Sequence, residues 1–459
     1  MGADLHFLGV RQLRAGYESK TFSPVEVARA CLDRIDALNA DFGAYCFVDH
    51  AAALRQARES EQRWLRGAPL GRIDGVPASI KDLFNTKGWP TRKGSRLAAL
   101  AGSEREDAPC TARLREAGAV LLGKTTTPEI GWKGITDNPN GDVARNPHDR
   151  ALTAGGSSGG AAVAAALGMG VLHIGSDGGG SIRIPSAFCG VFGLKPSFGR
   201  VPAYPPSAFG DVAHVGPMTR CVEDAAEMLN VIAEPDSRDP FTLPYEPLDY
   251  VERLALAAPQ PKCCWSANLG FVEVDREISA LCETAMRRLA CEGFVFVDRH
   301  FAIPNPQQIF HRLWFTGAAA ALRLLDAEAR AALDPGLAAI SAEGAALAHM
   351  DYVEATMARA ALRRDINLQF DAFDFLISPA MPIAAFEAER EFPLGSGMMR
   401  WTDWTGFTYP FNLSQQPAAV VPIGRTARGL PVALQIVGRR HADAAVLACA
   451  RRIEAIFGT

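Results

Sequence analysis

The chain has 459 residues, of which 48% are hydrophobic and 21% are charged, and its formal net charge is −4. This composition is that of a globular protein long enough to bury a large core, and it favours neither a nucleic-acid partner nor an anionic membrane surface. The first 17 residues have no apolar signal-peptide core, no apolar run is long enough to span a membrane, and ten scattered cysteines without a C-x-x-C pair favour reduced, buried thiols in a cytoplasmic protein.

The first part of the chain predicts helices that alternate with strands. Ser23-Pro24-Val25-Glu26 is a capping box with proline at the first helical position, so we expect a helix to begin there. The segment 75–84 predicts a strand and a turn that carry Lys81, and its apolar residues indicate a buried course. A buried lysine requires a functional or structural reason. Further helices are expected at 50–65 and 109–117, and a further strand at 119–122.

Residues 118–125 match the phosphate-loop pattern G-x-x-x-x-G-K-[ST]. In a phosphate loop the residues between the glycines form a loop between a strand and a helix. Here they are Ala119-Val120-Leu121-Leu122, which predict a strand, and a helix precedes them. We therefore expect no nucleotide at this stretch.

Residues 130–146 contain Gly, Asn and Pro throughout and predict a long loop. Residues 155–200 then carry two glycine–serine clusters, 155–160 and 178–181, separated by a helix expected at 161–167 and a buried strand at 171–175. The consecutive glycines of the second cluster can turn several N–H groups into one concavity, as an oxyanion requires. Ser181 follows that turn and opens the next segment, so its hydroxyl can lie beside the N–H groups of Gly178, Gly179, Gly180 and Ser181 itself.

The rest of the chain predicts one more loop and a mixed series of helices and strands. Residues 201–215 are rich in Gly and Pro, and Tyr204 and Phe209 within them are candidates for a lid over the site. Phe310, Trp314 and Phe315 are interpreted as core residues. Helices are expected at 221–233, 278–291, throughout 306–372 and at 443–456, and strands at 264–268, 294–297, 375–378, 418–421 and 432–437.

The motifs around the two serine clusters resemble the amidase signature family of serine amide hydrolases. The resemblance rests on GGSSGG, on the 24-residue step from Ser157 to Ser181, on GGSIRIPSAFCGVFGLKPS, and on VPASIKD upstream, and it covers most of the chain as far as GLPVALQIVG. One departure is Gly178, where many relatives carry a larger residue. The resemblance implies an α/β amidase signature fold with a large, mixed, twisted sheet surrounded by helices. Length alone predicts about three domains, whereas the resemblance implies a single domain over 1–459 with a mainly helical covering layer around 300–372.

The family uses a Ser–cis-Ser–Lys triad, and the matching positions are Ser181, Ser157 and Lys81. Ser181 would be the nucleophile, Ser157 the serine that relays the proton after a cis peptide bond, and Lys81 a base kept neutral by burial. The resemblance also implies that Ser158, Asp177 and Arg183 support the site, and the alternative interpretation of Asp177 and Arg183 is a surface ion pair. By the same resemblance, the 130–146 loop helps to line the acyl pocket, so its residues Gly131, Trp132, Lys133 and Ile135 are candidate substrate contacts.

Two alternatives remain open from the sequence. Residues 155–159 also match G-x-S-x-G, the nucleophile elbow of α/β-hydrolases, which would make Ser157 the nucleophile of an esterase. That elbow requires a preceding strand, but residues 146–150 are turn-like, and none of His173, His214 or His441 is distinguished as a base. The second alternative is an amidotransferase-type subunit that acts within a complex.

We therefore expect a hydrolase of C–N acyl bonds that needs no cofactor and has no metal-ligand spacing. Its substrates would be small carboxylic amides, with anilides, esters and carbamates or urethanes as further candidates. The IGWKGITDNPNGDVARN stretch is similar to bacterial members that act on aryl or xenobiotic amides. We expect a monomer or a homodimer, with neither nucleic acid nor membrane as a partner.

Overall fold

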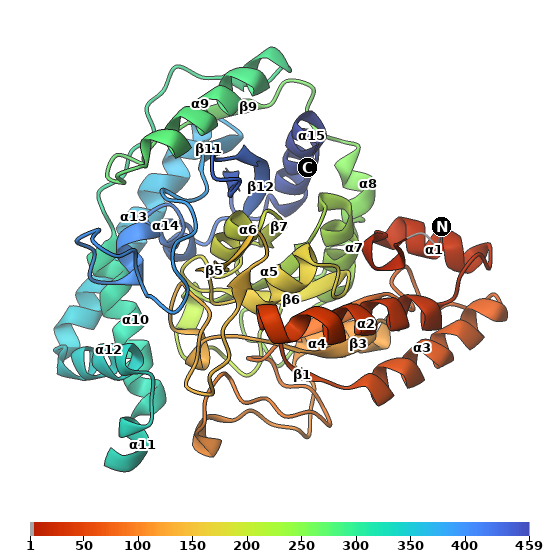
Figure 1. The fold of residues 1–459 in the computed structure, drawn as a ribbon. Coiled ribbons are helices and arrows are strands. Elements are labelled where there is room, and N and C mark those ends of the chain that lie inside the picture. Colours follow the sequence, from red (N-terminus) through yellow and green to blue (C-terminus); the bar gives the residue numbers. More distant parts are fainter. Residues whose placement is uncertain (1–3, 459) are drawn as a thin grey trace.

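An eleven-stranded mixed sheet runs through the centre of the molecule (Figure 1). The structure is a computed structural model and describes residues 4–458. The strand order is β1-β3-β2-β6-β8-β7-β12-β13-β11-β9-β10, with parallel and antiparallel neighbours, and a separate pair is formed by β4 and β5. The bounds are β1 Tyr45–Val48, β2 Pro77–Lys81, β3 Val120–Thr125, β4 Arg145–Asn146, β5 Asp149–Thr153, β6 Leu172–Asp177, β7 Phe192–Lys195, β8 His214–Thr219, β9 Lys262–Trp265, β10 Val295–Phe296, β11 Phe375–Pro379, β12 Ala418–Arg425 and β13 Pro431–Gly438.

Helices surround this sheet, so the predicted α/β class with a large mixed sheet is confirmed. Their bounds are α1 Val10–Glu18, α2 Pro24–Phe42, α3 His50–Leu65, α4 Pro109–Glu116, α5 Gly159–Ala166, α6 Arg183–Cys189, α7 Val222–Ile232, α8 Tyr250–Leu254, α9 Arg276–Cys291, α10 Gln307–Leu322, α11 Ala327–Ala331, α12 Pro335–Ala346, α13 His349–Gln369, α14 Tyr409–Leu413 and α15 Asp443–Phe457. Within residues 4–458, no helix is both long and apolar enough to cross a membrane.

Side chains that alternate along the strands contribute to hydrophobic layers on both faces of the sheet. In β3, Val120 and Leu122 pack with the small residues of α5, while Leu121 packs with a different cluster that includes residues of α7. This division follows from the two-residue period of a strand. Both faces of the central strands are therefore covered, and every residue of β2 is buried.

The active region lies where β2 and β6 end. The two strands run parallel, with Ala78 opposite Leu172 and Ile80 opposite Ile174. Because the carboxyl ends of parallel strands meet at one edge of the sheet, the last residue of β2, Lys81, comes close to Ser176 and Asp177 at the end of β6. The loops that follow both strands can therefore contribute to one site.

Local sequence signals explain most of the helices and strands. The capping box of Ser23 and Glu26 forms with both of its hydrogen bonds, and Gly43 ends α2 in the left-handed conformation with φ of 60°. The helix predicted at 50–65 is confirmed as α3. The strands and helices predicted around 119–122, 161–167 and 171–175 are confirmed within a few residues as β3, α5 and β6.

The structure corrects several expectations. The stretch 146–150, expected to be turn-like, contains the end of β4, a turn at 147–148 and the start of β5, so a strand does precede Ser157, although it lies outside the main sheet. The end of the expected 201–215 loop is the start of β8, an internal strand in which Pro217 lies opposite Ile174. The strongly helical region expected at 306–372 is confirmed, and it consists mainly of α10, α11, α12 and α13 (Figure 1).

Candidate active site

The ammonium group of Lys81 lies among three serine hydroxyls. Its Nζ is 2.6 Å from Ser157 Oγ, 2.9 Å from Ser158 Oγ and 2.9 Å from Ser176 Oγ. The lysine extends from the end of β2, two of the serines precede α5, and the third belongs to β6. The fold therefore places three hydroxyl groups from two segments within hydrogen-bonding distance of one nitrogen on a third segment.

Burial changes the acidity of Lys81. Its side chain is fully buried, and the loss of solvation lowers its pKa well below the usual value of 10.5, against the opposing effect of the Asp177 charge. A buried amine is easier to keep neutral, because the charged form loses its hydration. Lys81 is thus poised to accept a proton at a pH where an exposed lysine remains charged.

Ser157 is fixed by tight backbone packing. The Gly156–Ser157 peptide bond is cis, as the resemblance implied. A Cβ added at Gly156 would come within 2.3 Å of the carbonyl of Ile135, so only glycine fits at this position. Ser158 follows, donating a hydrogen bond to the carbonyl oxygen of Ser176 at 3.1 Å and accepting one from its N–H at 3.2 Å.

A buried ion pair holds the turn that carries Ser181. The carboxylate of Asp177 accepts hydrogen bonds from the N–H groups of Gly180 at 2.8 Å and Ile182 at 3.2 Å, and it pairs with the guanidinium of Arg183 at 2.9 Å. Both charged side chains are fully buried, so the surface-pair interpretation is wrong. Burial alone would raise the pKa of Asp177, but the charges of Arg183 and Lys195 and the hydrogen bonds from Arg183 and Asn412 together outweigh burial and hold that pKa below its usual range.

Distant parts of the chain complete this arrangement. The guanidinium of Arg183 donates to the carbonyl of Thr408 and to the side chains of Gln435 and Asn412, at 2.9, 2.7 and 2.6 Å. Hydrogen-bonded partners therefore restrain Asp177 and Arg183 from several directions, and the turn between them has little freedom to change shape.

The turn presents a set of N–H groups beside Ser181. The N–H groups of Gly178, Gly179 and Ser181 make no hydrogen bond to any residue of 4–458. The N–H of Gly180, also expected in the oxyanion site, donates to the carboxylate of Asp177 and is not free in this structure. The carboxylate of Asp177 holds the turn by accepting a hydrogen bond from a backbone N–H of the turn, and the N–H of Gly180 donates that bond.

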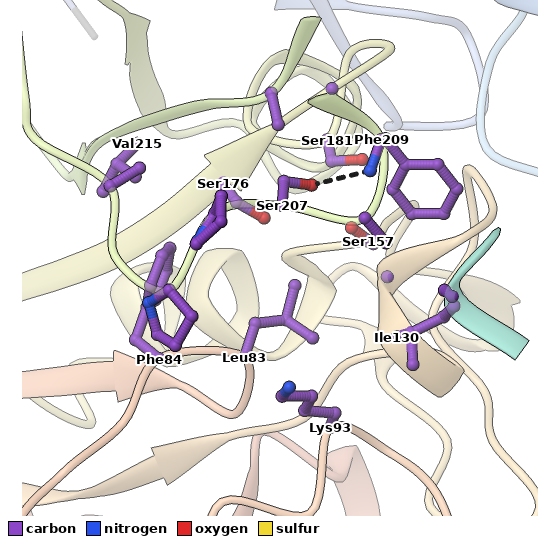
Figure 2. Close-up of a pocket in the computed structure, with 18 of the residues that line it drawn as sticks. Leu83, Phe84, Lys93, Ile130, Ser157, Ser176, Ser181, Ser207, Phe209 and Val215 are labelled. Carbon is purple, nitrogen blue, oxygen red and sulfur yellow. Dashed lines mark hydrogen bonds between the residues drawn. The ribbon is translucent and has the colours of Figure 1, made fainter. Parts of the chain in front are cut away.

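Ser157, Ser176 and Ser181 line one cavity of about 310 Å³. Figure 2 shows the hydroxyls of Ser157 and Ser181 on the same side of this cavity, and no hydrogen bond joins them directly. The remaining wall is largely apolar and comes from the β2–α4 connection, from η3 (Glu129–Gly131), from the loop before β8 and from α10. The loop residue Phe209 is held there by its N–H, which donates to Ser207 Oγ at 3.1 Å.

The candidate substrate contacts divide into two groups. Gly131 and Phe209 line the cavity, whereas Trp132, Ile135 and Tyr204 are not among the residues that line it. Trp132 and Ile135 are buried in the core behind the wall, and Tyr204 lies under the guanidinium of Arg238 at 5.3 Å. Lys133 is also absent from the lining, because its ammonium pairs with Asp137 and Asp334.

Sequence reasoning missed two residues of the site. Ser176 was assigned no role, and Trp314, interpreted as core, lines the cavity and stacks on Phe209 with ring centroids 3.5 Å apart. A Cβ added at Gly178 would come within 2.8 Å of the Trp314 ring, so the indole occupies the space next to this glycine. No local pattern in the sequence links Gly178 to Trp314, because the contact joins segments far apart in the chain.

The histidine required by the nucleophile-elbow alternative is not in contact with Ser157. His173 is hydrogen-bonded to Ser79 at 2.7 Å, and His214 lines the cavity with its Nδ1 against the carbonyls of Val212 and Asp177. Because carbonyls only accept, Nδ1 of His214 carries the hydrogen, and burial lowers its pKa well below 6.5, so this ring is neutral. In the described part of the chain, no group of three His, Cys, Asp or Glu residues is arranged to hold a metal ion.

Comparisons with known proteins agree with this geometry. A family model described as Amidase matches residues 26–447. The chain is 38% identical over 460 residues to an acylamidase of Rhodococcus erythropolis, covering 99% of this chain and 96% of that protein. It is also 34% identical to one of the subunits of the glutamyl-tRNA(Gln) amidotransferase of Chloroflexus aurantiacus, covering 97% of this chain and 95% of that protein.

Solved structures give the same result. The fold matches a bacterial aryl acylamidase of the amidase signature enzymes with a TM-score of 0.91 and 30% identity, covering 99% of this chain and 97% of that one. A structure described as a peptide amidase in complex with the competitive inhibitor chymostatin matches with a TM-score of 0.82 and 27% identity, covering 98% and 97%.

Proposed function

The chain belongs to the amidase family, the amidase signature enzymes, and we propose that it hydrolyses small carboxylic amides through an acyl-enzyme on Ser181. The observation that carries the proposal is the 2.6 Å contact of Lys81 Nζ with Ser157 Oγ inside a cavity that Ser181 also lines. Amide hydrolysis needs a nucleophile, a base, an oxyanion site and an acid for the leaving amine. These residues can supply all four.

The proton path begins with neutral Lys81. A neutral amine has two N–H donors and one lone pair, so one of its three serine partners must donate a hydrogen to it. Ser158 uses its own hydrogen on the carbonyl of Ser176. Ser157 is the shortest of the remaining contacts, and after giving its hydrogen to Lys81 it can accept the proton of Ser181.

Ser181 Oγ then attacks the substrate carbonyl carbon. The negative charge on the carbonyl oxygen is stabilised by the free N–H groups of Gly178, Gly179 and Ser181. The proton held by Lys81 returns through Ser157 to the nitrogen of the breaking C–N bond, and the amine departs. Water repeats the same steps on the acyl-enzyme and releases the carboxylic acid, so one amide and one water give one acid and one amine.

The cavity supports anilides, esters and carbamates or urethanes as further substrates, because its wall near the serines is apolar and the same attack serves each acyl group. The similarity to an acylamidase and to an aryl acylamidase supports amides as the first class of substrate. We place the protein in the cytoplasm on the strength of its ten cysteines, all free in this structure, and propose a monomer or homodimer.

The test is hydrolysis of a para-nitroanilide by the isolated chain, combined with labelling by a fluorophosphonate and peptide mapping. We expect nitroaniline release, labelling of Ser181, and loss of both in Ser181→Ala. Labelling of Ser157 would instead support the nucleophile-elbow esterase. Turnover only in the presence of a partner protein would support the amidotransferase role, which is the function named for several relatives.

A further inference from the structure

One charged side chain lies in the wall of the cavity. Lys93 is the only Lys, Arg, Asp or Glu among the described residues that line it, and the other ionisable group, His214, is held neutral. Serines, alanines, prolines and large apolar residues make up most of the remaining lining. A single positive charge in an otherwise uncharged wall gives the cavity one point that favours a negative group.

Lys93 lies away from the reacting groups. In Figure 2 it is on the side of the cavity opposite Ser157 and Ser181, beyond Leu83 and Ile130. A substrate whose amide carbonyl meets Ser181 would therefore have to extend past these two apolar side chains before it reached the lysine. This arrangement suits a substrate with an apolar spacer between its scissile amide and a distant anionic group.

The backbone of Lys93 is fixed on both sides. Its carbonyl accepts a hydrogen bond from the N–H of Ile130 at 2.7 Å, and the flanking N–H groups of Arg92 and Gly94 donate to the carboxylate of Asp82 at 3.3 and 3.4 Å. Lys93 itself has φ of 56°, a left-handed conformation that is uncommon outside glycine. The surroundings therefore hold this lysine in an unfavourable backbone state that sets the direction of its side chain.

The ammonium group has no partner of its own. Its Nζ makes no hydrogen bond and no ion pair with any residue of 4–458. The nearby carboxylate of Asp82 is instead 3.4 Å from Lys124. Partial burial lowers the pKa of Lys93, against the weaker opposing effect of Asp82. A half-buried cation without a counter-ion gains more from a bound anion than an exposed one does.

We propose that Lys93 determines specificity by binding a carboxylate on the substrate, separated from the scissile amide by an apolar spacer. The preferred substrates are then aryl or alkyl amides with a terminal carboxylate. This inference rests on the proposed amidase function and adds a substrate class to it. The carboxylate is carried either by the leaving amine or by the acyl group. Each of these two positions is therefore tested with its own pair of substrates.

The experiment compares each carboxylate substrate with a neutral methyl-ketone analogue of similar shape. For the leaving amine the pair is para-acetamidobenzoate and para-acetamidoacetophenone. For the acyl group it is the mono-para-nitroanilide of glutaric acid and the analogue whose carboxylate is replaced by acetyl. The kcat/KM ratio of acid to ketone is measured for the wild type, Lys93→Gln, Lys93→Arg and the control Lys87→Gln, an exposed lysine on the same connection.

We expect the acid-to-ketone ratio in one of the two pairs to fall about tenfold in Lys93→Gln, because a hydrogen bond to a charged group contributes about that factor. Most of the loss should lie in KM, Lys93→Arg should keep the preference for the acid, and Lys87→Gln should leave the ratio unchanged. A ratio that is the same in wild type and Lys93→Gln for both pairs would overturn the inference while the ketones still report amidase activity. Failure of the wild type to hydrolyse either ketone would overturn the amidase proposal and this inference with it.

Discussion

Lys81 contacts three hydroxyl groups, and its protonation state decides whether it can take a proton from Ser157. Because burial lowers its pKa well below 10.5, the neutral form gains population at a lower pH than for an exposed lysine. The acylation rate should therefore rise with pH and reach its plateau below the range of a free lysine. Single-turnover rates across pH, in wild type and Lys81→Ala, measure this dependence, and a profile that survives the substitution would remove Lys81 from the role of base.

The same residue should distinguish leaving groups. An amine departs poorly unless it is protonated, whereas a nitrophenolate departs as the anion. Lys81→Ala should therefore reduce amide hydrolysis about 10²–10⁴-fold more than it reduces hydrolysis of a matched nitrophenyl ester, since general acid catalysis contributes a factor of that size. Equal losses on the amide and the ester would mean that Lys81 does not supply the proton to the amine.

The ion pair of Asp177 and Arg183 affects the stability of the protein. Asp177→Asn leaves the buried guanidinium without its counter-charge, and breaking a buried pair in this way costs about 3–5 kcal/mol of unfolding free energy. Urea denaturation measures the loss. The control is Asp365→Asn, which breaks an exposed pair with Arg364 and should change stability by less than about 1 kcal/mol. A similar small change for both variants would show that the buried pair does not brace the turn.

At the scale of elements, one contact joins the glycine turn before Ser181 to α10. Gly178 has a backbone conformation open to other residues, but an added Cβ would come within 2.8 Å of Trp314. Gly178→Ala should therefore displace the indole, reduce activity and cost about 1–3 kcal/mol of stability, as overpacking does. Trp314→Phe in the same chain should restore part of both. Gly71→Ala, where nothing lies within 4 Å, is the neutral control, and a Gly178→Ala enzyme with unchanged kinetics and stability would contradict this account.

The loop before β8 is the second element that reaches the cavity. Phe209 stacks on Trp314, whereas Tyr204, in the same loop, lies outside the lining. Phe209→Ala should alter the relative kcat/KM of substrates with large and small acyl groups more than it lowers the melting temperature. Tyr204→Ala should leave the ratio of substrates unchanged. If Phe209→Ala reduces kcat/KM by the same factor for all substrates and lowers the melting temperature, Phe209 acts only as a core residue.

Features of the fold and of the site could be predicted from the sequence where a short, local pattern encodes them. The capping box at Ser23 and the burial of Lys81 could be inferred from short patterns, and the glycine turn before Ser181 could be inferred from its motif. The strand β8 was missed because Gly216 and Pro217 interrupt its pattern, although its neighbours β6 and β7 hold it inside the sheet. Ser176 and Trp314 were missed because their roles depend on contacts between segments far apart in sequence.

At the scale of the whole molecule, burial controls the chemistry of the thiols. All ten cysteines are free, seven are buried, two are intermediate, and Cys291 is exposed. An Ellman titration of the native protein should therefore show one fast thiol, absent from Cys291→Ser, and ten thiols after denaturation. Several fast thiols in the native state would mean that the core opens more readily than its packing indicates.

The hydrogen-bond partners of Arg183 determine when, during synthesis of the chain, the turn before Ser181 can reach its final shape. Lys81, Ser157 and Ser181, the residues of the proposed reaction, have been synthesised by residue 181. The groups that accept hydrogen bonds from Arg183, on Thr408, Asn412 and Gln435, follow it by 225 to 252 residues. A nascent chain on the ribosome therefore carries every reacting group long before it can shape the site. We expect translation products that stop before residue 408 to be inert toward fluorophosphonates, so that a cell accumulating incomplete chains is not exposed to an unselective acyl-transfer reagent.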